Sequence, residues 1–122
     1  MKLELSSLPK TWLIDVDGTI VKHNGYKNNG DVLLEGVQEF FAQIDEQDVV
    51  ILLTARNELF RQETEDFFKA HNIRYDKIIF GLPTGERILI NDDKPSGLKM
   101  GHAINKTRDG NISLFIKINK DL

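Results

Sequence analysis

The chain has 122 residues, of which 40% are hydrophobic and 29% charged, and its formal net charge is -3. This length fits one domain, and the slightly acidic balance without a dense Lys/Arg run argues against nucleic acid as a partner. The chain has no cysteine, which excludes disulfides and thiolate metal sites and fits a cytoplasmic protein, and its apolar runs are too short for a membrane span.

The apolar patterning predicts strands and helices in alternation. Residues 1–10 are expected to form an irregular lead-in before a first strand at 11–16, and the Gly- and Asn-rich residues 18–31 to form a flap loop over its end. Asp31 is placed to cap a helix. The remaining elements expected in chain order are a helix at 32–44, a strand within 48–56, a helix at 57–71, a strand at 73–80, a strand at 87–93, a helix at 95–106 and a strand at 112–118. Strands separated by helices favour a single α/β domain over 1–122, with a mainly parallel five-stranded sheet covered by helices on both faces.

Polar side chains follow three of these strands, at the point where each strand ends. Asp15 and Asp17 follow the first strand, Thr54 the second, and Asp92 with Asp93 the fourth. Ligands of open parallel sheets bind outside the carboxyl ends of the strands, so we expect these residues to form one site. Carboxylate oxygens suit Mg²⁺, and a bound Mg²⁺ would attract phosphate. The Thr54 hydroxyl and backbone N–H groups of the turn after Asp15 can donate to phosphoryl oxygens.

The same residues suit phosphoryl transfer. A carboxylate can attack phosphorus directly and form an aspartyl-phosphate, and Asp15 is the better nucleophile because the sheet holds it at the strand end. Asp17 could then protonate the leaving alkoxide and later deprotonate the attacking water. Arg56 either binds substrate or is a surface charge, and the sequence favours neither.

Three motifs resemble those of the haloacid dehalogenase (HAD) superfamily, in its phosphatase branch: Asp15-Val-Asp17-Gly-Thr19, Leu53-Thr54-Ala55-Arg56 and Asn91-Asp92-Asp93-Lys94. The resemblance covers about residues 11–106. It implies a Rossmann-like three-layer αβα fold and Mg²⁺-dependent phosphoester hydrolysis through an aspartyl-phosphate.

By motif position the resemblance assigns roles to single residues. Asp15 would be the nucleophile and a metal ligand, and Asp17 the acid/base that binds metal through its backbone carbonyl. Asp92 would be the third protein ligand, with Asp93 as its partner or substitute. The substrate phosphate would be held by residues of the first two motifs, namely Gly18, Thr19, Thr54, Ala55 and Arg56.

One feature departs from the family pattern. Related small phosphatases often carry Gly-Lys-Pro shortly before the last motif, where this chain has Gly81-Leu82-Pro83. The cation that would bridge nucleophile and phosphate is therefore expected at Lys94 first and Lys77 second. Arg87 ranks last, because it starts a predicted strand and so lies far from the strand's carboxyl end.

The sequence leaves no room for a cap domain, since single helices fill the spacings in which caps are inserted. An open site suggests a bulky substrate, or a homo-oligomer whose neighbouring subunit covers it. We therefore expect a capless phosphatase for a small phosphorylated metabolite, with a sugar phosphate of carbohydrate metabolism as the first guess. The alternatives are a phosphoacceptor or regulatory module and a catalytically weakened HAD-like binding protein.

Overall fold

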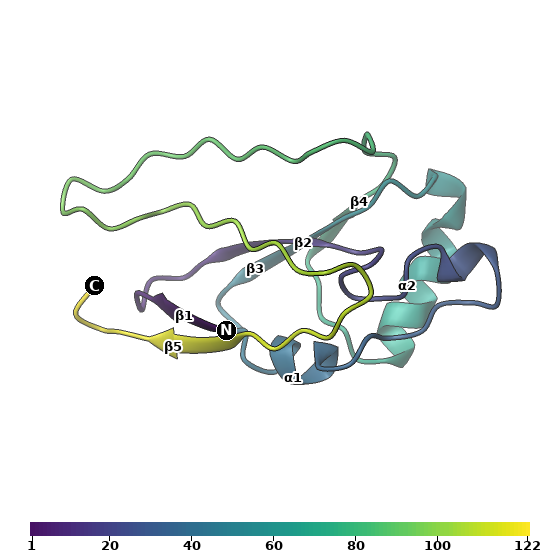
Figure 1. Cartoon of the computed structure of the whole chain (residues 1–122), viewed down its shortest axis with the longest axis horizontal. Helices are drawn as coiled ribbons and strands as arrows, with labels where there is room; N and C mark the ends of the chain where they lie inside the picture. Colours follow the sequence, from purple (N-terminus) through teal and green to yellow (C-terminus); the bar gives the residue numbers. More distant parts are fainter.

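Five short strands form two parallel sheets in the computed structural model, which describes residues 1–122 (Figure 1). The strands β2 (Thr11–Asp15), β3 (Val49–Leu53) and β4 (Lys77–Ile79) form one sheet in that order. The strands β1 (Lys2–Leu5) and β5 (Phe115–Ile118) pair in the other. The chain is therefore an α/β protein with parallel strands, but the expected single five-stranded sheet is not formed.

Four short helical segments connect the strands. They are η1 (Gly25–Lys27), α1 (Val37–Phe41), η2 (Glu58–Phe60) and α2 (Arg61–Ala70). The Asn57 side chain accepts a hydrogen bond from the Leu59 N–H at 2.9 Å, which caps η2 and starts the predicted helix at 57–71. None of these helices has the length and apolar character that crossing a bilayer requires.

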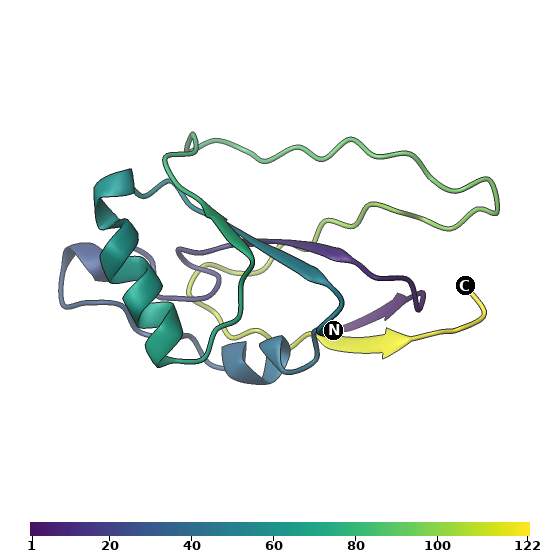
Figure 2. The ribbon, with the colours of Figure 1, turned by 180° about the vertical axis from the view of Figure 1, so that it is seen from behind.

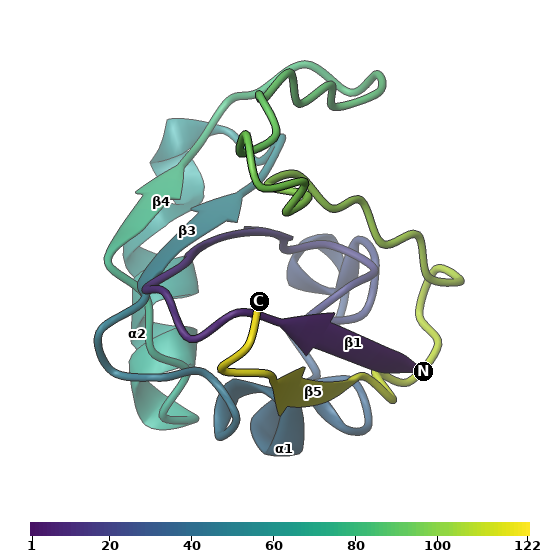
Figure 3. The same cartoon turned by 90° about the vertical axis from the view of Figure 1, so that its left-hand side faces the viewer.

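The core lies on one face of the three-stranded sheet. Ile14, Leu52 and Ile78 are register partners and point to the same face. Phe40 of α1 and Phe68 of α2 are buried in the same cluster, so both helices cover this face. Figure 3 shows α2 behind β3 and β4, with α1 below. The opposite face carries Leu13, which is half exposed. The sheet therefore has helices on one side only, which is a correction to the three-layer expectation.

Asp48 fixes the start of β2 against β3. Its buried carboxylate accepts hydrogen bonds from the Lys10 N–H and the Trp12 Nε1–H, each at 2.9 Å. Because these bonds join the two strands at their amino ends, they support the register that sets Asp15 opposite Leu53. The carboxyl ends of β2 and β3 consequently lie at the same edge.

Two predictions in the first half of the chain are wrong. Residues 1–10 are not an irregular lead-in, because β1 pairs with β5, a partner that a local pattern cannot show. The helix expected at 32–44 begins only at Val37, since Gly36 has a φ of +84°, where a Cβ would lie 2.1 Å from the Ile112 carbonyl oxygen. Leu33 instead forms an antiparallel bridge with Val21, which closes the flap loop at its base.

The strand expected at 87–93 and the helix expected at 95–106 are also absent. Residues 84–107, the excursion, leave the sheet after β4, turn at 94–98 and return (Figures 1 and 2). Ile90, in the most apolar part, is 92% exposed. An apolar run becomes a strand only where another strand pairs with it through backbone hydrogen bonds, and residues 87–93 have no such partner strand.

We expect Leu52→Ala to lower the free energy of unfolding by about 2–5 kcal/mol, because Leu52 is fully buried at the centre of β3. Urea denaturation measures this loss. Leu59→Ala is the matched control, since Leu59 is 88% exposed and its truncation leaves no cavity. Equal losses in the two variants would contradict the placement of the core.

Candidate functional site

The carboxyl ends of β2 and β3 bring three of the predicted site residues together. Asp15 ends β2, Asp17 follows two residues later, and Thr54 directly follows β3. The Thr54 hydroxyl donates to Asp17 Oδ2 at 3.0 Å. The first two motifs of the resemblance therefore meet at one edge of the sheet.

Asp15 is the accessible carboxylate of this edge. Its side chain is 38% exposed. Oδ2 accepts from the Thr19 hydroxyl at 2.9 Å, and Oδ1 accepts from an Arg87 guanidinium nitrogen at 2.6 Å. Both oxygens are thus oriented by side chains, one of them a cation that the sequence analysis ranked last. That ranking assumed a strand at 87–93, and without the strand Arg87 lies beside the site.

The turn after β2 offers groups that suit an anion. Gly18 has a φ of +85°, which favours glycine. The backbone N–H groups of Asp17 and Ala55 donate to no acceptor of the chain, and each follows the end of a strand. Unpaired backbone N–H groups at such a turn are donors for a phosphoryl group.

A second cation, which the sequence patterns do not predict, lies at this turn. Lys106 Nζ donates to the Gly18 carbonyl at 2.9 Å and the Thr107 carbonyl at 3.0 Å. Burial lowers the pKa of Lys106 below its usual value, against the opposing charges of Asp109 and Asp15. The Asp109 N–H in turn donates to the Gly18 carbonyl at 3.0 Å and fixes this part of the chain on the turn. No sequence motif marks Lys106, which contacts Gly18 across a separation of 88 positions in the sequence.

Arg56 lies behind the site and not in it. The residue is 2% exposed, and its side chain has five N–H donors. Nε and Nη2 donate to Asp17, Nη1 and Nη2 to Asp31, and Nη1 also to the Thr64 hydroxyl, at 2.7–3.3 Å. All five N–H groups are therefore used inside the protein. The interpretation of Arg56 as a surface charge is wrong, because the residue is buried, and in this arrangement every N–H group of the side chain already has a partner within the protein.

Asp31 is part of the same network, and does not cap a helix as expected. Its carboxylate accepts hydrogen bonds from both Nη atoms of Arg56. The ring of Tyr26 in η1 lies on the guanidinium, whose carbon is 4.1 Å from the ring centroid. Burial by itself lowers the pKa of Arg56, but the hydrogen bonds and charges of Asp31 and Asp17 raise it above its usual value. Arg56 consequently stays charged and binds two carboxylates from opposite ends of the flap loop.

Four other predicted residues lie apart from this edge. Asp93 pairs with Lys99 at 2.7 Å, Lys94 belongs to the turn at 94–98, and Asp92 is exposed in the excursion beside them. Lys77 is exposed at the start of β4. No three His, Asp or Glu side chains form a group that could hold a metal ion. The ligands that the resemblance names, Asp15, the Asp17 carbonyl and Asp92, are therefore not brought together in this arrangement.

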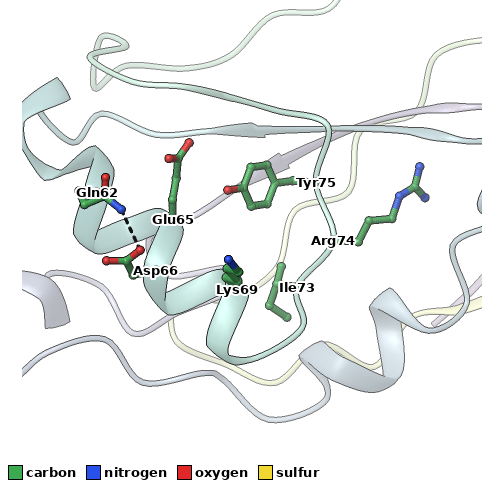
Figure 4. A pocket seen from close by; sticks show the side chains of 7 residues that line it. All are labelled: Gln62, Glu65, Asp66, Lys69, Ile73, Arg74 and Tyr75. Carbon is green, nitrogen blue, oxygen red and sulfur yellow. Dashed lines mark hydrogen bonds between the residues drawn. The ribbon is translucent and has the colours of Figure 1, made fainter.

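A separate hollow of about 410 Å³ lies against α2 (Figure 4). Burial and the charge of Glu65 raise the pKa of Tyr75 in its wall. The wall carries both signs of charge and includes none of the predicted site residues; it is formed by Gln62, Glu65, Asp66, Lys69, Ile73, Arg74 and Tyr75. It therefore adds nothing to the site at the strand ends.

Comparisons with protein-family models, with curated proteins and with solved structures found no match to this chain.

We expect Arg56→Met to lower the free energy of unfolding by about 3–5 kcal/mol, because it leaves two buried carboxylates without their partner. Denaturant unfolding measures this loss. Arg61→Met is the matched control: Arg61 pairs with Glu58 and Glu65 at the surface, and exposed pairs contribute little. Similar losses in the two variants would contradict the buried network.

Proposed function

We propose that this chain is a HAD-type phosphatase that hydrolyses a phosphomonoester of a small metabolite through an aspartyl-phosphate on Asp15. The observation that carries the proposal is the edge shared by β2 and β3. There an accessible, oriented carboxylate lies beside a second carboxylate, a threonine and two unpaired backbone N–H groups. Phosphoryl transfer depends mostly on positioning and charge stabilisation, and this edge offers groups for both.

The reaction would proceed in two displacements. An Asp15 oxygen attacks phosphorus, which forms the carboxylate–phosphorus bond and breaks the ester P–O bond, while Asp17 gives a proton to the departing alkoxide. Water then attacks phosphorus and returns a proton to Asp17, which releases inorganic phosphate and restores Asp15. To take part, Asp17 must exchange one of its present hydrogen bonds for one to the leaving group.

Lys106 is our choice for the cation that the Gly81-Leu82-Pro83 sequence lacks. It lies on the Gly18 turn and near the Asp15 charge, and the Asp109–Gly18 hydrogen bond holds the neighbouring backbone there. Its ammonium would neutralise charge on the phosphoryl oxygens. Lys94 and Lys77, the earlier candidates, have no comparable contact with the turn.

The proposal includes a magnesium requirement and a Rossmann-like five-stranded sheet, and the first depends on the second. The strand β2 pairs with β3 only and so has a free edge, and the apolar residues of 87–93 are exposed in the excursion. Pairing of 87–93 with this edge would bring Asp92 and Asp93 to the carboxyl end of β2. The ligands that the resemblance names, Asp15, the Asp17 carbonyl and Asp92, would then be neighbours. A cytoplasmic location and a homo-oligomer that covers the open site complete the proposal.

A second candidate is a HAD-like phosphate-binding or phosphoacceptor protein without turnover. The observation that favours it is that arginines already engage both carboxylates, Arg87 at Asp15 and Arg56 at Asp17. Such a protein would bind phosphate, or take up one equivalent of phosphoryl group, and would not hydrolyse a substrate repeatedly.

We expect the purified chain to release phosphate from at least one member of a panel of sugar and nucleotide monophosphates in Mg²⁺. Asp15→Asn and chelation of the metal should each abolish release, because the first removes the nucleophile and the second the metal that the proposal requires. Asp66→Asn is the matched control, since Asp66 is exposed on α2 and bonds only Gln62.

Each other outcome of this assay has a definite meaning. Formation of one equivalent of stable phosphoprotein would favour the phosphoacceptor. Binding of a phosphorylated compound without release of phosphate would favour the catalytically weakened binding protein. Turnover that survives chelation would contradict the magnesium requirement. Hydrogen exchange over residues 87–93 tests the sheet independently, because pairing with β2 should slow it when Mg²⁺ is added.

We expect Lys106→Met to lower kcat/KM by roughly 100-fold, because an apolar side chain of similar length cannot stabilise charge on the phosphoryl group. Steady-state kinetics measures the loss. Lys94→Met makes the same change at the turn at 94–98, away from Gly18, and should leave kcat/KM within about twofold of wild type. If the larger loss fell on Lys94→Met, the assignment of Lys106 would be wrong.

A further inference from the structure

We infer that Arg56 is a positioning residue that couples the flap loop to the general acid/base Asp17. The inference rests on the proposed function for the role of Asp17, but the contacts that carry it do not. The Arg56 guanidinium binds Asp17, where the flap loop begins, and Asp31, where it ends. One rigid planar group thus holds both ends of a loop of about 14 residues.

The geometry of the guanidinium makes the two carboxylates interdependent. Nη2 donates to Asp31 at 2.7 Å and to Asp17 at 2.9 Å, so a single nitrogen serves both. The fork is planar and its donors have fixed directions. A shift of Asp31 therefore turns the fork, and a turned fork moves the oxygens of Asp17. No water can replace a lost partner easily, because Arg56 is buried.

A third contact ties the middle of the loop to the same group. Tyr26 in η1 lies on the guanidinium, with a centroid distance of 4.1 Å, and packs edge-on against Phe60 at 4.8 Å. A cation on an aromatic face adds attraction that grows as water is excluded. Arg56 is consequently attached to the loop at Asp31 and at Tyr26, beside the contacts of Tyr26 with Phe60 and of the His23 N–H with Asp109.

The charges of the network are not balanced. One guanidinium faces two carboxylates that are both largely buried, which leaves an excess negative charge. Burial of uncompensated charge is costly, so the network gains if one carboxylate moves towards water or another cation. Asp31 can leave with the flap, whereas Asp17 is also held by Thr54. A substrate whose leaving group contacts the flap loop would thus keep Asp31 on Arg56, and Arg56 would keep Asp17 in place. Binding at the loop would in this way align the acid/base.

Asp31→Asn tests the coupling without removing the buried arginine. The substitution keeps the shape of the side chain and leaves one carboxylate for one guanidinium, so we expect the variant to fold. We expect kcat to fall about 10- to 100-fold with KM within about threefold, because misplacement of a catalytic group costs rate more than binding. We also expect faster hydrogen exchange at the Lys27, Asn28 and Gly30 amides, which bond only within the loop. Asp66→Asn should change neither quantity.

The reciprocal variant needs no activity. Coupling between two sites acts equally in both directions, so Asp17→Asn should also speed exchange at these three amides. If neither variant changed the exchange, or if Asp31→Asn loosened the loop while kcat stayed at the wild-type value, the coupling would be refuted. An inactive wild type would refute the proposed function instead, and the two exchange measurements would still decide the coupling.

Discussion

The conformation of the site depends on the buried ion pairs of Arg56. A guanidinium without contact to water must keep its acceptors, and the chain supplies them from three separate places: Asp17 after β2, Asp31 at the end of the flap loop and Thr64 in α2. These bonds fix the start of α2 relative to the turn that follows β2. The hydrophobic core positions the two strands, and this one polar side chain ties the loop to them at Asp17 and Asp31.

Part of the fold could be predicted from the sequence because some elements carry their own signal. The strands β2 and β3 are short apolar runs, and α2 has a helical pattern of apolar residues, so each was found. The strand β1 was not, and the helix expected at 32–44 was found only in part, as the shorter α1. The first depends on β5, which lies at the other end of the chain, and the second on the approach of Ile112 to Gly36. Both are consequences of tertiary structure that no local window contains.

The residues of the site also fall into those that the sequence predicts and those that it does not. Asp15, Asp17 and Thr54 follow apolar runs that form neighbouring strands, so the ends of these strands could be predicted to meet. Lys106 and Arg87 come from a part of the chain whose expected strand and helix are not formed, and their place beside Gly18 and Asp15 could not be predicted. Arg56 was found but misinterpreted, because the sequence does not say which charges are buried.

The contact between Arg87 and Asp15 and the proposed metal site exclude one another. If residues 87–93 paired in parallel with β2 so that Asp92 lay beside Asp15, Arg87 would lie five residues nearer the amino end of the sheet, about 16 Å away. Arg87 would then have released Asp15 Oδ1, the oxygen it occupies here. In either arrangement the exposed carboxylate at the end of β2 has a cation beside it, first the guanidinium and then the metal. If the proposed metal site forms, the ion pair between Arg87 and Asp15 is therefore the contact that metal binding would have to displace.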